Sequence, residues 1–197
     1  MDTDVIDMLA GIEPGSALDA IRNRRPQARE QAQSSYRALF APETPGEFTA
    51  TERFAVATFV AGLHGDEEIA SFYADGLAAS GASAELRGAI DEAVAKAKGQ
   101  GPYGAFPAGP LSREDTVGPV YRVAAATRRA LGARLSAAFE HLHLLVFHPR
   151  DAAPAALQAL LDAGWSTTDI VTLSQMAAFL SFQIRVVVGL RVLARTI

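Results

Sequence analysis

The chain has 197 residues, of which 49% are hydrophobic and 20% are charged. This composition is typical of a folded protein with one large domain or two small ones, whose core needs no metal or disulfide. The chain contains no cysteine, which excludes disulfides, thiolate metal sites and cysteine nucleophiles. A net charge of −4 argues against binding along the phosphate backbone of nucleic acids, so we expect no nucleic-acid partner.

The first eight residues are acidic and lack the apolar run of a secretory signal. The most apolar segment, residues 170–193, is long enough to cross a bilayer. It also carries serine, glutamine and arginine side chains, which are costly in lipid. We therefore expect this segment to be a helix buried in protein, and the chain to be cytoplasmic with no membrane partner.

The sequence predicts an all-α fold. Alanine, the best helix former, accounts for 39 of the residues, and no run of alternating β-branched residues lies between hairpin turns. In the N-terminal part we expect a first helix that begins after Ser16, is interrupted at Pro26 and ends near Phe40.

Three more helices are expected before residue 99. Thr49 and Glu52 have the spacing of a capping box, which predicts a helix from there to about Leu63. A second helix is expected over 67–79 and an amphipathic third over 84–98.

Five glycines and four prolines fall within residues 99–119. We expect a loop here, which joins two halves, 1–98 and 120–197, of a single domain. Ser112 and Asp115 are spaced to cap a short helix inside it. A long helix is predicted over 120–147.

The last two helices also follow from local signals. Pro154 and Gly164 bound a short helix over 154–163. Ser166 and Asp169 then predict the start of the last long helix.

The segments Phe48–Glu52 and Trp165–Asp169 have the same pattern: an aromatic residue, a hydroxyl N-cap and an acid three residues later, followed by a long apolar helix. The similarity has two explanations. The chain could contain a duplicated helical unit, or two efficient helix starts could look alike because the physics of starting a helix is the same.

Four histidines are candidates for chemistry, and three of them lie close together in the sequence: His141, His143 and His148. Glu140 with these histidines could form a metal site, but residues two apart point to different sides of a helix. A protonated histidine near the end of a helix is also favoured by the helix dipole alone. We expect no metal and no cofactor.

Polar side chains interrupt the apolar last helix at Thr172, Gln175, Gln183 and Arg185. Buried polar groups need partners, since each unpaired one costs about 1–3 kcal/mol. They could form hydrogen bonds between helices that fix the packing. Alternatively, they could line a small polar pocket, in which Arg185 and Gln175 would bind a substrate.

Two segments resemble a known superfamily. Residues 163–175, followed by 179–186, resemble the peroxidase-related branch of the alkylhydroperoxidase AhpD and carboxymuconolactone decarboxylase superfamily. Residues 48–77, which begin with the Thr51-Glu52-Arg53 segment, resemble its other helical half. The close resemblance covers under a third of the chain. It implies an AhpD-like bundle with a repeated helical unit, usually assembled as a homo-oligomer.

The resemblance also reveals a departure at the redox centre. Active members carry a glutamate, a Cys-x-x-Cys motif with a histidine inside it, and a further histidine. In an ungapped alignment the glutamate falls on Phe54, and the two cysteines fall on Asp66 and Ile69. The two histidines fall on Glu68 and Tyr73. Because a thiolate must attack the peroxide and a second thiol must resolve it, this chain alone cannot perform thiol peroxidase chemistry.

The residues at those positions are candidates for different chemistry. His64, Asp66, Glu68 and Tyr73 could form an acid–base set at the mouth of a pocket, with Arg185 binding an anion. One hypothesis is therefore an enzyme related to the peroxidases or a cysteine-independent lactone decarboxylase. The other is a non-catalytic helical protein that self-associates or binds a small ligand. A pocket lined by these residues favours the first, and a filled core favours the second.

Overall fold

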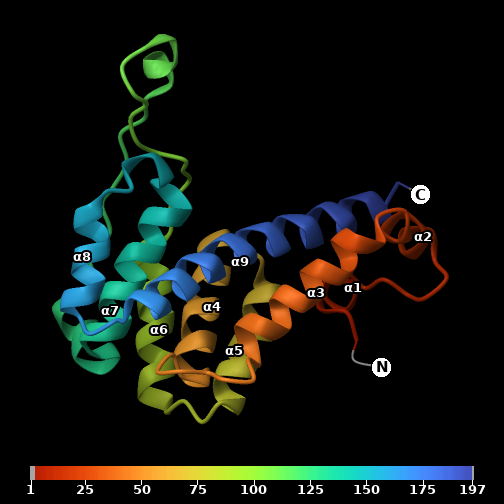
Figure 1. Ribbon diagram of the computed structural model, residues 1–197, viewed down its shortest axis with the longest axis horizontal. Helices are drawn as coiled ribbons and strands as arrows, with labels where there is room; N and C mark the ends of the chain where they lie inside the picture. Colours follow the sequence, from red (N-terminus) through yellow and green to blue (C-terminus); the bar gives the residue numbers. More distant parts are fainter. Residues whose placement is uncertain (1–2, 197) are drawn as a thin grey trace.

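The computed structural model describes residues 3–196, and within them the chain is all-α (Figure 1), as the sequence predicts. Nine α-helices and two short 3-10 helices are present in this part of the chain, without a strand. The helices are α1 Val5–Ala10, α2 Ala17–Asn23, α3 Pro26–Phe40, α4 Ala50–His64, α5 Glu67–Ala79, α6 Ala84–Ala97, α7 Ala125–Phe147, α8 Pro154–Asp162 and α9 Thr167–Ala194, with the 3-10 helices η1 Pro110–Glu114 and η2 Pro149–Asp151.

Most predicted helix starts are confirmed by the caps themselves. Thr49 and Glu52 form the reciprocal capping box at the start of α4. The Ser166 side chain accepts a hydrogen bond from the backbone N–H of Asp169 at the start of α9. Asp66 caps α5 in the same way, because its carboxylate accepts from the backbone N–H of Ile69. These bonds satisfy amide groups that have no partner inside the helix.

Helices α1 and α7 differ from the prediction. Helix α1 is absent from it, because six residues are too short to give a periodic pattern; the helix is instead defined by its Asp4 N-cap and by Gly11 at its end. Helix α7 begins at Ala125 rather than at Val120. Residues 120–124 are not helical, and here the backbone N–H of Val123 donates to Glu140 in α7 at 3.0 Å.

The loop between α6 and α7 is longer than predicted and projects from the bundle (Figure 1). A short helix, η1, does lie inside it, but the predicted cap is wrong: η1 begins after Gly109, Ser112 lies within it, and Asp115 follows its end. Near its base the loop is closed by reciprocal backbone hydrogen bonds between Gly104 and Thr116.

Helix α4 lies at the centre of the bundle and packs against α5, α6, α7 and α9. Helix α9 crosses the whole molecule, from α7 and α8 at one end to α1 and α3 at the other (Figure 1). It is long and apolar enough to cross a membrane, and 39% of its most apolar 18-residue window is buried in the structure.

A buried arginine fixes the start of α4. Arg53 is only 4% exposed, and its guanidinium donates to the backbone carbonyls of Phe48, Leu39 and Pro45 at 2.8, 2.7 and 3.1 Å. Burial lowers the pKa of Arg53, whereas the nearby carboxylates of Asp169 and Glu52 oppose this shift. The side chain therefore joins the end of α3, the turn after it and α4.

The start of α9 lies against the start of α4. The Phe48 and Trp165 rings meet edge to face, with their centroids 4.9 Å apart. Arg134 of α7 lies over the Trp165 ring and pairs with Glu52 at 3.0 Å. We call this contact among Phe48, Arg53, Arg134 and Trp165 the helix-start junction. The two similar segments are thus in contact, although the repeated unit stays a prediction.

Replacing Arg53 by Met is expected to lower the free energy of unfolding by about 3 kcal/mol, because three buried carbonyl oxygens lose their donor. Arg53→Lys should lose less, since it keeps the charge but not the forked geometry. Urea unfolding measures the effect. The control is Arg24→Met, at an exposed position, which should change stability by less than about 0.5 kcal/mol. Equal effects of the Arg53→Met and Arg24→Met changes would contradict the role of the junction.

Candidate functional site

A cavity of about 750 Å³ lies between the end of α4, the start of the projecting loop, the end of α7 and the middle of α9. We call it the main cavity. Its size and mostly apolar lining, with a few polar groups, are typical of small-molecule sites. It is lined by Leu63, His64, Gly99, Gln100, Gly101, Pro102, Leu145, Val146, Phe147, Pro149, Ser174, Ala177, Ala178, Ser181, Phe182 and Arg185.

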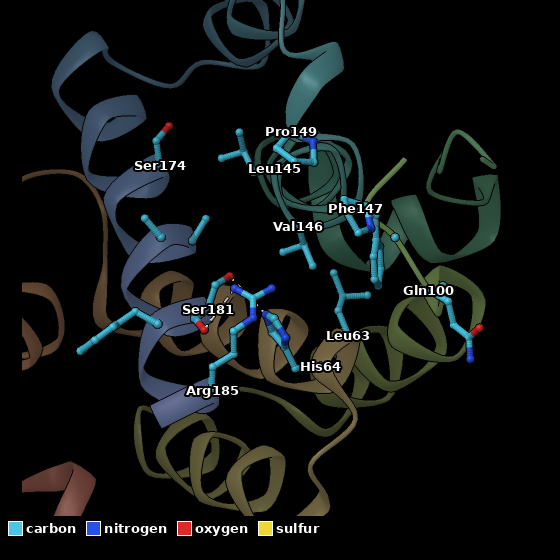
Figure 2. A pocket seen from close by; sticks show the side chains of 16 residues that line it. Leu63, His64, Gln100, Leu145, Val146, Phe147, Pro149, Ser174, Ser181 and Arg185 are labelled. Carbon is cyan, nitrogen blue, oxygen red and sulfur yellow. Dashed lines mark hydrogen bonds between the residues drawn. The ribbon is translucent and has the colours of Figure 1, made fainter. Parts of the chain in front are cut away.

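Three polar side chains, those of His64, Ser181 and Arg185, gather at one end of the main cavity (Figure 2). His64 is the last residue of α4, and its Nε2 lies 3.2 Å from the Oγ of Ser181 on α9. Arg185 lies one turn further along α9 and extends its guanidinium beside this pair (Figure 2). Among the residues that line the cavity, none is a carboxylate. The charge at this end is therefore positive.

Burial lowers the pKa of His64 to about 4, and the positive charge of Arg185 adds to this effect. The imidazole is therefore neutral at neutral pH and carries one N–H donor and one acceptor. Arg185 keeps its charge under all ordinary conditions. An anion bound here would contact the positive charge of Arg185 and the neutral imidazole of His64, which can take up a proton.

The wall of the main cavity opposite α9 contains a close backbone contact that requires glycine at position 101. The backbone N–H of Tyr103 donates to the Phe147 carbonyl at the end of α7, at 2.6 Å, which brings the loop close to this helix. A Cβ atom at Gly101 would lie 2.7 Å from that carbonyl oxygen and 2.9 Å from the Phe147 Cα. Only glycine allows so close a contact between the two backbones.

The comparisons give no family. Neither the protein-family models, nor the curated proteins, nor the solved structures gave a match to this chain. Inferences about the site therefore rest on its geometry, and the AhpD-like resemblance stays a prediction.

The structure brings together two of the six residues proposed from the sequence, His64 and Arg185. Asp66 and Glu68 instead bind Arg191 on the C-terminal half of α9, with nitrogen–oxygen distances of 3.0 and 2.8 Å. The same guanidinium donates to the Leu9 carbonyl of α1. This group therefore holds α1, α5 and α9 together, and neither carboxylate lines the main cavity.

The other two proposed residues also lie outside the main cavity. Tyr73 is fully buried in the core, and its hydroxyl donates to Gln183 Oε1 on α9. Burial raises the pKa of Tyr73 well above its usual range. This bond confirms that Gln183 finds a partner between helices. Gln175 is exposed on the outer side of α9.

Of the three histidines near the end of α7, His143 and His148 pack against neighbouring residues, whereas both ring nitrogens of the buried His141 have no hydrogen-bond partner in the described chain. His148 contacts Asp151 through Nδ1 and the Pro119 carbonyl through Nε2, at 3.1 and 3.0 Å. Burial lowers the pKa of His143 to about 4, and His148 contributes to the shift. Over residues 3–196 no three histidine or carboxylate side chains are grouped so that they could hold a metal ion.

Ser181 was not proposed from the sequence. A serine in an apolar helix usually bonds to its own backbone, as Ser174 does to the Ile170 carbonyl at 2.9 Å. The sequence did contain a signal for Ser181. It lies four residues before Arg185, and residues four apart share a helix face.

Replacing Gly101 by Ala is expected to lower the free energy of unfolding by about 1–3 kcal/mol, since the added methyl group meets backbone atoms that cannot turn away. The control is Gly88→Ala in α6, where nothing lies within 4 Å of the added Cβ. That change should be neutral or stabilise by up to about 1 kcal/mol. Urea unfolding compares the two variants, and a stable Gly101→Ala protein would contradict the close packing of this wall.

Proposed function

We propose that this protein binds a small amphiphilic anion, such as an organic carboxylate, in the main cavity. The observation that carries the proposal is the placing of Arg185 and His64 together at one end of a mostly apolar space. A carboxylate would bind the guanidinium, and the apolar part of the molecule would lie against Leu63, Val146 and Phe182.

The charges around Arg185 support this proposal. Among the described residues no carboxylate forms an ion pair with it, and its guanidinium contacts only the Ser181 carbonyl, at 3.5 Å. By contrast, Arg191 lies six residues further along α9 and is paired with Asp66 and Glu68. Of these two arginines, Arg185 is the one that a ligand can use.

A second candidate function is proton transfer to or from a carboxylated substrate, as in a cysteine-independent lactone decarboxylase. The observation that favours it is the contact of 3.2 Å between His64 and Ser181. A neutral imidazole can accept a proton, but it must first be protonated before it can act as a general acid. Binding therefore has stronger support than catalysis, because it needs no prior protonation of His64.

An AhpD-like scaffold without its thiol centre would be consistent with both functions. With no cysteine in the chain, any peroxidase-related role would require a partner protein that carries the thiols. Self-association as a homo-oligomer and a cytoplasmic location stay predictions.

Replacing Arg185 by Gln is expected to weaken the binding of hexanesulfonate by about tenfold or more, because a charged hydrogen bond is worth about 1.5–3 kcal/mol. Titration calorimetry or NMR measures the affinity. Arg195→Gln at the end of α9 is the matched control and should bind like the unaltered protein. Hexanol tests the charge directly, since its weaker binding should not depend on Arg185. Equal affinity for hexanesulfonate in both variants would rule out Arg185 as the anion-binding group.

Anion binding is expected to strengthen as the pH falls from about 8 to about 5. The His64 pKa is about 4 in the free protein, and a bound anion raises it, so the complex takes up a proton that the free protein does not hold. The affinity should rise by up to about tenfold per pH unit below the raised pKa and should level off below about pH 4. The sulfonate probe stays ionised throughout this range.

His64→Asn should remove this pH dependence. The matched change His143→Asn should keep it, because His143 also has a pKa near 4 but does not line the main cavity. A pH dependence that survives in His64→Asn would show that another group takes up the proton.

A further inference from the structure

A second hollow of about 310 Å³ lies next to the main cavity. It lies between α7, α9 and the start of α8, and it shares Leu145 and Ser174 with the main cavity. In Figure 2, Ser174 and Leu145 lie at the end of the main cavity away from Arg185 and His64. The two hollows therefore adjoin at these residues, and we call the line from Arg185 past Ser174 into the second hollow the path.

The path follows one face of α9. From Arg185 it passes Ser181, Ala178 and Ala177 and reaches Ser174, which is eleven residues, or about 17 Å of helix. The α9 residues that line the main cavity between these two ends have small side chains, except for Phe182. A single ligand that reaches from Arg185 into the second hollow must therefore be extended.

The second hollow is suited to an apolar group. Leu145, Pro154 and Leu157 lie on its walls, and no charged side chain of the described chain lines it. Ser174 already donates to the Ile170 carbonyl. His141, the other polar residue, is 6% exposed, and burial lowers its pKa, so its ring is neutral at neutral pH. Neither His141 ring nitrogen has a hydrogen-bond partner in the described chain, so the neutral ring still offers one donor and one acceptor. The hollow provides no fixed positive charge for a second anionic group.

Exposed apolar side chains lie near both ends of the path. Phe182 at the main cavity is 47% exposed and Leu157 at the second hollow is 44% exposed. An apolar chain along the path would cover both of them.

We infer that the anion held by Arg185 carries an unbranched apolar tail that extends past Ser174 into the second hollow, so that the ligand class is a fatty-acid-like amphiphile. This inference rests on the proposed function, because the head group is the anion proposed above. It adds the shape and chemistry of the rest of the ligand.

The test is a series of alkyl sulfonates from butane- to decanesulfonate, below their micelle concentrations, titrated into the unaltered protein. Each methylene group that enters the second hollow should tighten binding by up to about fourfold, which corresponds to about 0.8 kcal/mol per buried methylene. Hexanesulfonate reports on the head group and the main cavity, and decanesulfonate reports on the second hollow.

Ala156→Phe should fill the second hollow from α8. It should abolish the gain between hexane- and decanesulfonate but leave hexanesulfonate binding unchanged. The matched control is Ala155→Phe, at the neighbouring position, which does not line this hollow. Decanesulfonate should bind that variant as tightly as it binds the unaltered protein. In the unaltered protein, nuclear Overhauser contacts should join the terminal methyl of decanesulfonate to Leu157 and Ala153.

The outcomes separate the two proposals. If hexanesulfonate does not bind, or binds without Arg185, the proposed function fails. If hexanesulfonate binds through Arg185 but longer chains bind no tighter, the head-group site stands and the tail inference is overturned. The tail inference is also overturned if the chain-length gain persists in a folded Ala156→Phe protein, or if the terminal methyl contacts residues elsewhere.

Discussion

The helix-start junction is the constraint on which the candidate site depends. The guanidinium of Arg53 holds the start of α4, and the Phe48–Trp165 contact places the start of α9 beside it. His64 lies eleven residues after Arg53 in α4, which is about 17 Å along the helix. Ser181 lies twelve residues after Asp169 in α9, which is about 18 Å along that helix. Because α4 and α9 also pack against each other, these nearly equal distances from a common start bring His64 and Ser181 together.

The main cavity exists because of the residues that α9 turns toward α7. Ser174, Ala177, Ala178 and Ser181 have small side chains, so the two helices and the loop leave space between them. The remaining α9 contacts are made by large residues such as Leu173 and Leu180, which are fully buried against other elements. The stability of the helix thus comes from one face, while the face with small residues is free for a ligand.

Local signals were enough to predict most of the fold. Capping residues, glycines and prolines act over a few positions, so the bounds of α5 and the starts of α4 and α9 followed from the sequence. Residues 120–124 were misassigned because their extended form depends on Glu140, seventeen residues from Val123. The same limit applies to the site. Tyr73 and Gln183 are 110 positions apart, and no local pattern predicts that they bond.

The contacts that the four proposed acid–base residues make explain why binding has more support than catalysis. Asp66 and Glu68 neutralise Arg191, and Tyr73 is bonded to Gln183 in the core, so three of the four stabilise the packing of α9. Of this group, only His64 faces the main cavity in the described chain. A relay of protons needs at least one further group within hydrogen-bond distance, and the one beside His64 is a serine whose hydroxyl ionises far above neutral pH. A single neutral imidazole next to a fixed positive charge is better suited to holding an anion than to moving protons through a relay.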